Sequence, residues 1–90
     1  MIDNYMLYKN IPTLDLHGLD RYSAIYEVNV FINDNIKLNN KLLKIVHGIG
    51  EGILKNEVHK YLKSKKEVKD YKIDIYNIGT TIVELNLKGN

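Results

Sequence analysis

Two short apolar segments of this chain each end in a histidine and a glycine, and each leads directly into a segment with helical spacing. In the first, residues 13–17, Leu14 and Leu16 alternate with Asp15 and His17 as in a strand. The second, residues 41–47, is richly apolar, as expected of a strand covered on both faces. Strands and helices that alternate in this way restrict a chain of ninety residues to a small α/β fold with one core.

The rest of the chain completes this pattern. Apolar residues at helical spacing predict helices over residues 21–38 and 53–66. Residues 71–77 and 81–87 alternate between apolar and polar side chains and predict two more strands, which a turn at Gly79-Thr80 would join in antiparallel fashion. The predicted fold class is therefore α/β, an α+β two-layer sandwich. Its β-α-β-α-β-β order forms a mixed four-stranded sheet with two helices on one face.

Composition limits the classes of function. We expect one domain at residues 13–88 after an N-terminal extension of residues 1–12. The absence of cysteine excludes disulfides, zinc–thiolate sites and thiol nucleophiles. No apolar run approaches the roughly 20 residues that cross a bilayer, and the first residues lack a signal-peptide pattern. We therefore expect a cytoplasmic protein without a membrane partner.

The net charge of +2 is unevenly distributed. Residues 1–40 hold three basic and five acidic residues, whereas residues 41–90 hold ten lysines and six acidic residues. Such a lysine excess can bind phosphates, because each neutralised phosphate releases counterions. Alternatively, it is only the solvated face of a helix. The excess is concentrated in Lys60, Lys63, Lys65, Lys66 and Lys69.

Asp15 and His17 are two residues apart on a predicted strand, so their side chains point to the same face. They also lie at the carboxyl end of the strand, where open α/β sheets place their ligands. A carboxylate beside an imidazole raises the basicity of the ring, as a general base or a metal ligand requires. Alternatively, His17 only ends the strand and Asp15 binds nearby backbone N–H groups. The spacing leaves both interpretations open.

A glycine-rich turn, residues 48–52, follows the second strand and opens the second helix. Such a turn offers backbone N–H groups and the positive end of a helix to an anion. Lys55 would add a cation one turn into the helix, whereas Glu51 would oppose an anion unless it points away or helps to hold a metal. The turn does not end in the Gly-Lys-Ser/Thr of a Walker loop. Alternatively, it is only a tight connection.

Adjacent parallel strands end at the same edge of a sheet, so His17 is expected to lie beside His47 and the glycine-rich turn that follows it. The two imidazoles, the Asp15 carboxylate and the backbone N–H groups of the turn could together hold a phosphodiester while His17 or His47 transfers a proton. His59 lies further along the second helix and is interpreted as a surface residue.

Three segments together resemble the Smr (small MutS-related) domain family. Leu14-Asp15-Leu16-His17-Gly18 matches the signature that opens these domains, and residues 47–55 are similar to their second signature. The ending at residues 79–85 resembles the family's closing strand. The resemblance covers roughly residues 13–87.

This resemblance implies a fold similar to the C-terminal domain of bacterial translation initiation factor three. It also implies binding to DNA or RNA and, as in several members, endonuclease activity that nicks DNA or cleaves RNA. Asp15 and His17 take the place of the family's Asp-x-His pair implicated in cleavage. Gly48 and Gly50 take the place of its substrate-contacting loop. The expected catalytic set is Asp15, His17 and His47, and the expected phosphate-binding set is Gly18, Gly48, Gly50, Gly52 and Lys55.

Three hypotheses follow. The first is an endonuclease that is either histidine-catalysed or assisted by Mg²⁺ or Mn²⁺, with the metal ligands unknown. The second is a non-catalytic module that docks on nucleic acid or on the ribosome. The third is a domain of a larger MutS-like ATPase that acts in recombination control or on stalled ribosomes. The domain itself is expected to be monomeric.

Overall fold

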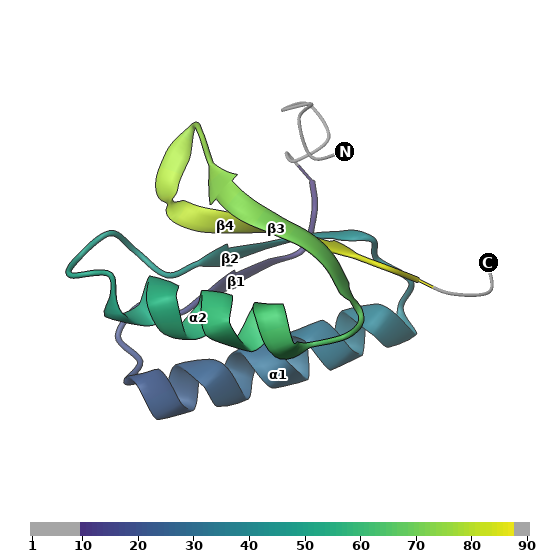
Figure 1. Ribbon diagram of the computed structural model, residues 1–90, viewed down its shortest axis with the longest axis horizontal. Coiled ribbons are helices and arrows are strands. Elements are labelled where there is room, and N and C mark those ends of the chain that lie inside the picture. Colours follow the sequence, from purple (N-terminus) through teal and green to yellow (C-terminus); the bar gives the residue numbers. More distant parts are fainter. Residues whose placement is uncertain (1–9, 88–90) are drawn as a thin grey trace.

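The computed structural model describes residues 10–87, and its elements follow the predicted order (Figure 1). Both predicted helices are confirmed, and neither differs from its predicted range by more than two residues. Most of the predicted N-terminal extension lies outside the described residues. The elements are β1 (Thr13–Asp15), α1 (Arg21–Lys37), β2 (Leu42–Val46), α2 (Ile53–Ser64), β3 (Val68–Asp74) and β4 (Asn77–Leu85).

The four strands form one mixed sheet in the order β1-β2-β4-β3. β1 and β2 are parallel, with Asp15 beside Val46, and the Leu16 N–H donates to the Val46 carbonyl at 2.9 Å. β4 lies between β2 and β3 and is antiparallel to both. The predicted mixed sheet is therefore confirmed, and β1 and β2 end at the same edge.

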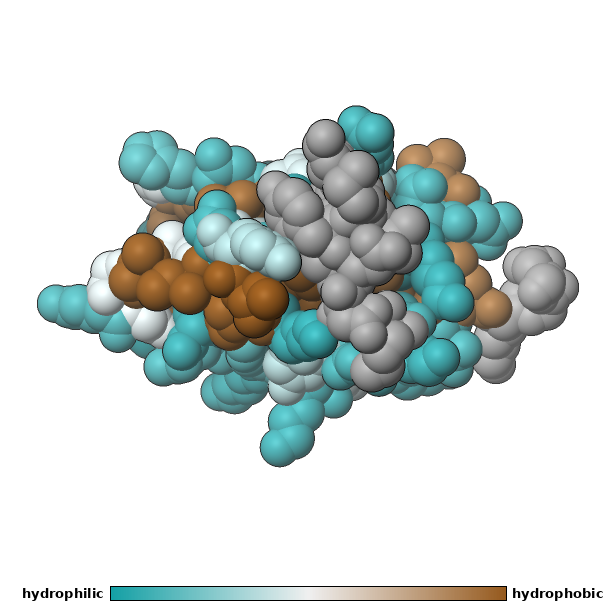
Figure 2. Space-filling model, turned by 90° about the horizontal axis from the view of Figure 1, so that it is seen from above, coloured by the Kyte–Doolittle hydropathy of each residue, from teal (hydrophilic) through white to brown (hydrophobic). Residues whose placement is uncertain are grey.

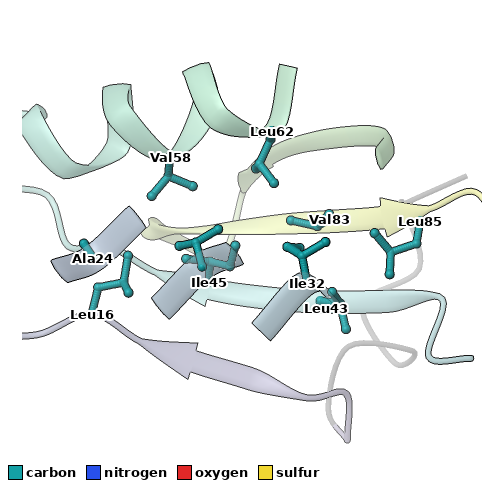
Figure 3. Close-up of a cluster of buried hydrophobic side chains, with 10 residues drawn as sticks. Leu16, Ala24, Ile32, Leu43, Ile45, Val58, Leu62, Val83 and Leu85 are labelled. Carbon is teal, nitrogen blue, oxygen red and sulfur yellow. The ribbon is translucent and has the colours of Figure 1, made fainter. Parts of the chain in front are cut away.

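Both helices cover one face of the sheet, and the main core fills the space between the two layers (Figures 1 and 3). Leu16 is fully buried there, so the predicted alternation of β1 is observed. Truncation of such a leucine to alanine costs about 2–5 kcal/mol. α1 begins after Asp20, whose carboxylate accepts the Ser23 N–H at 2.7 Å. This hydrogen bond lowers the pKa of Asp20.

The two faces of β4 have different surroundings. Val83 and Leu85 belong to the main core beneath the helices. Ile82 immediately precedes Val83 in sequence and packs instead with Ile11 and Leu42, on the opposite face of the sheet. Because side chains alternate along a strand, the odd-numbered residues of β4 from Thr81 to Leu85 face the helices, and the even-numbered residues face the opposite side of the sheet.

The turn predicted at Gly79-Thr80 is wrong. Gly79 and Thr80 lie inside β4, and the turn is formed by Ile75 and Tyr76. The Asp74 carboxylate accepts the Tyr76 N–H at 2.9 Å, which is how aspartate commonly stabilises a turn. The last two strands are antiparallel as predicted, but they occupy residues 68–74 and 77–85 instead of 71–77 and 81–87.

Candidate nucleic-acid interface

The predicted pair Asp15 and His17 is exposed at the end of β1. Leu16, between them, points into the core, and the chain then turns at Gly18, which has a φ of +80°. The Asp15 carboxylate accepts the backbone N–H of His17 at 2.9 Å. Alternation therefore directs both side chains to solvent, while one carboxylate oxygen stabilises the backbone that carries the imidazole.

The glycine-rich turn, residues 48–52, forms an exposed loop that we call the glycine loop. Gly48, Gly50 and Gly52 have φ values of +82°, +32° and +82°, a region that side chains with a Cβ rarely adopt. The loop and the first turn of α2 line a small pocket of about 190 Å³. Gly52 precedes α2 without a side-chain cap, and the first turn of the helix holds no acidic residue. The positive end of α2 therefore lies in this pocket.

The glycine loop is fixed to β4, one of the two inner strands of the sheet. The N–H groups of His47 and Gly48 both donate to the Gly79 carbonyl, each at 2.9 Å. A Cβ on Gly79 would lie only 3.2 Å from the Gly48 Cα, so a glycine at this position allows the two backbones to approach closely without displacement. This contact explains why Gly79 lies within a strand instead of at a turn.

His47 does not share the exposure of Asp15 and His17. Only 7% of its surface is accessible, and both ring nitrogens are engaged within the protein. Nδ1 lies 2.9 Å from the Gly48 carbonyl and Nε2 lies 2.8 Å from the Thr81 hydroxyl. Burial lowers the pKa of His47, and the nearby charge of Lys55 lowers it further. Proton transfer by His47 stays a prediction, because its observed contacts are those of a residue that holds the loop.

The interpretation of His59 as a surface residue is wrong. Its ring is half-buried, its Nε2 lies 2.7 Å from the Thr81 hydroxyl, and it packs edge-on against Tyr71. Burial lowers the pKa of His59, and electrostatic interactions with His47 and Lys55 lower it further. Two sequence signals were available for this site. His59 is three residues before the buried Leu62, and Thr81 alternates with the core residues of β4.

Charge near the site comes mainly from α2 and the glycine loop. Lys55 and Glu51 both line the pocket, so a cation and an opposing carboxylate lie beside the loop amides. The lysine cluster is elsewhere: it extends from Lys60 past the end of α2, whereas the glycine loop precedes this helix. Two of the five lysines are engaged, since Lys65 donates to Asn33 at 2.9 Å and Lys69 lies 3.8 Å from Glu84.

Apolar side chains are exposed beside the glycine loop. In Figure 2, brown surface gathers at the end of the molecule that carries the β3–β4 hairpin. The Gly48–Gly79 contact joins this hairpin to the glycine loop. The exposed residues are Ile49 and Ile53 from the loop and α2, and Ile75, Tyr76 and Ile78 from the hairpin, with 53–79% of their surfaces accessible.

Residues 10–87 contain no group of three or more histidine, aspartate or glutamate side chains that could hold a metal ion. One oxygen of the Asp15 carboxylate is already engaged by the His17 N–H. These residues do not form a site for Mg²⁺ or Mn²⁺ by themselves. Within the same part of the chain, neither helix is long and apolar enough to cross a membrane.

The sequence and fold place this chain in a known class of domain. Residues 14–86 match the Smr domain family, so the chain belongs to this family. The Smr domain of Thermus thermophilus MutS2 has a similar crystal structure, with a TM-score of 0.81 and 27% identity over 83% of this chain and 98% of that one. YdaL, a stand-alone small MutS-related protein from Escherichia coli, shares the fold with a TM-score of 0.81 at 21% identity, over 87% of this chain and 66% of that one.

Similar sequences occur within much longer proteins. The chain is 38% identical over 76 residues to the protein named endonuclease MutS2 of Clostridium kluyveri, and 40% identical over 75 residues to that of Clostridium botulinum. These matches cover 81% and 80% of this chain. In both cases the chain spans about 10% of the length of the relative. It is therefore similar to one domain of those proteins.

Proposed function

We propose that this chain is a nucleic-acid-binding Smr domain that cleaves phosphodiester bonds of RNA or DNA. The observation that carries the proposal is the exposure of Asp15 and His17 at the same sheet edge as the glycine loop and the uncapped start of α2. The name of the similar MutS2 proteins, endonuclease, supports the reaction type.

Each part has a distinct role in this proposal. The N–H groups of the glycine loop and the first turn of α2, with Lys55, would contact a phosphate. His17 would accept a proton from the attacking oxygen, which belongs to the 2′-hydroxyl in RNA and to a water molecule in DNA. As this oxygen bonds to phosphorus, the bond from phosphorus to the leaving oxygen breaks, and the leaving oxygen takes a proton from the protonated His17 or from solvent. Asp15 would hold the backbone that carries His17, through the hydrogen bond of 2.9 Å. None of these steps requires a metal ligand from the protein.

A non-catalytic docking module is the second candidate. It is favoured by the same hydrogen bond, because an aspartate that accepts the N–H two residues on is a common way to stabilise a turn. In that case the same face would bind DNA, RNA or the ribosome without cleavage. Roles in recombination control or on stalled ribosomes, and membership of a larger MutS-like protein, would be compatible with either candidate.

Cleavage assays separate the two candidates. Supercoiled DNA and a labelled structured RNA are incubated with the protein, with and without Mg²⁺ or Mn²⁺. His17→Ala and Asp15→Asn are tested beside Asp34→Asn, which removes an exposed carboxylate near the other end of α1. We expect cleavage by the wild type and by Asp34→Asn, and a loss of about 100-fold or more in His17→Ala. Cleavage that survives both active-site substitutions would refute the catalytic assignment, and binding without cleavage would favour the docking module.

A further inference from the structure

One hydroxyl group joins the base of the glycine loop to helix α2. Thr81 is fully buried and faces the helices, since it alternates with Val83. Its Oγ1 lies 2.8 Å from His47 Nε2 and 2.7 Å from His59 Nε2. His47, the last residue before the loop, and His59, at the centre of α2, therefore meet at a single oxygen atom of β4.

The direction of each hydrogen bond follows from the chemistry of its ends. The Gly48 carbonyl can only accept, so His47 Nδ1 must carry the proton that it donates at 2.9 Å. A neutral His47 then accepts at Nε2, and among residues 10–87 the donor there is the Thr81 hydroxyl. Because that hydroxyl has donated its one hydrogen, its oxygen accepts from His59 Nε2. Donation therefore runs in one direction, from His59 through Thr81 and His47 to the loop.

Burial of both rings lowers the pKa of His47 and of His59, which agrees with two neutral imidazoles near neutral pH. Buried polar groups are costly unless each is satisfied, and a satisfied chain holds its members in one arrangement. Valine has nearly the same shape as threonine and would fill the same space in β4 without a polar group. The hydroxyl is therefore needed for the hydrogen bonds and not for packing.

We propose that Thr81 and His59 are positioning residues for the glycine loop: they hold His47 as the Nδ1–H tautomer, and its ring in turn holds the Gly48 carbonyl. Gly48 is then fixed on both sides, because its N–H is bound to Gly79. The role in phosphate binding rests on the proposed function, whereas the role in loop conformation does not.

Thr81→Val and Thr80→Val form a matched pair for the test. Thr80 is the neighbouring buried threonine, it faces the opposite side of the sheet, and its hydroxyl has no hydrogen-bond partner among the described residues. Nitrogen NMR of the imidazoles reports the tautomers, and amide NMR reports the conformation of the glycine loop. Thermal unfolding shows whether each variant is folded.

We expect Thr81→Val to shift the amide signals of the glycine loop and to change the nitrogen signals of His47 and His59. Its affinity for inorganic phosphate, titrated by NMR, should fall about tenfold. Thr80→Val should leave all of these unchanged. If Thr81→Val and Thr80→Val gave the same loop and imidazole signals, the proposal would be wrong.

Variants of His59 provide a second test that does not depend on the folding of Thr81→Val. His59→Gln keeps an N–H donor that can reach Thr81, whereas His59→Leu removes it. We expect the loop signals of the glutamine variant to resemble those of the wild type and those of the leucine variant to be shifted. Equal loop signals in both variants would refute the role of His59. If the wild type bound neither phosphate nor nucleic acid, the proposed function would fail, while the tautomer and loop comparisons would still decide the positioning roles.

Discussion

Gly79→Ala tests how closely the glycine loop must approach the sheet. The added Cβ would lie 3.2 Å from the Cα and 3.3 Å from the carbonyl carbon of Gly48. Carbon atoms pack best at about 3.5–4.0 Å, so one of the two backbones must move. Any such movement lengthens the hydrogen bonds that His47 and Gly48 donate to the Gly79 carbonyl.

The expected cost is that of overpacking against backbone, about 1–3 kcal/mol. For a domain of this size this corresponds to a fall in Tm of roughly 4–24 °C. Gly18→Ala is the matched control, because its φ is +80° but no further heavy atom lies within 4 Å of the added Cβ. It should cost only the backbone strain, about 1–2 kcal/mol, and should leave the loop in place.

Thermal and urea unfolding, followed by circular dichroism, measure the free energy of unfolding, and amide hydrogen exchange reports the two hydrogen bonds to Gly79. We expect exchange at His47 and Gly48 to accelerate in Gly79→Ala and to stay unchanged in Gly18→Ala. An unchanged Tm together with unchanged exchange in Gly79→Ala would refute the close approach.

Two further predictions concern charge. Because burial lowers the pKa of His47 and His59 below the ordinary value of 6.5, the unfolded chain binds more protons than the folded protein just below this pH. The free energy of unfolding should therefore be steady above pH 6.5 and fall as the pH decreases below it, and this fall should be less steep in His59→Gln. Urea unfolding at several pH values measures this dependence, and an equal dependence of the unfolding free energy on pH in the two proteins would contradict the prediction. Glu51→Gln removes a carboxylate from the glycine loop and should strengthen phosphate binding about twofold to fivefold at low salt. NMR titration measures this gain, which should shrink as salt is added, and no gain at low salt would show that Glu51 points away from the bound anion.

The last two strands show where local patterns mislead. Glycine commonly marks a turn, and this rule placed the turn at Gly79-Thr80. The structure uses Gly79 for close approach to Gly48 and forms the turn at Ile75 and Tyr76. The local signal for the true turn was Asp74, whose carboxylate accepts the Tyr76 N–H. Which glycine lies against another backbone depends on residues distant in sequence, so a local pattern could not separate the two uses.

The sequence by itself determined the order of strands and helices, the outward direction of Asp15 and His17, and the place of the glycine loop between a strand and a helix. These features depend on periodicity and on glycine conformation, which act over a few neighbouring residues. Only the tertiary structure placed β4 in the middle of the sheet and brought Thr81 to His47 and His59. Those contacts join residues 34 and 22 positions apart, and they arise because the sheet and helices pack around one core. Packing therefore decided that His47 is buried and holds the loop, while His17 stays exposed at the candidate site.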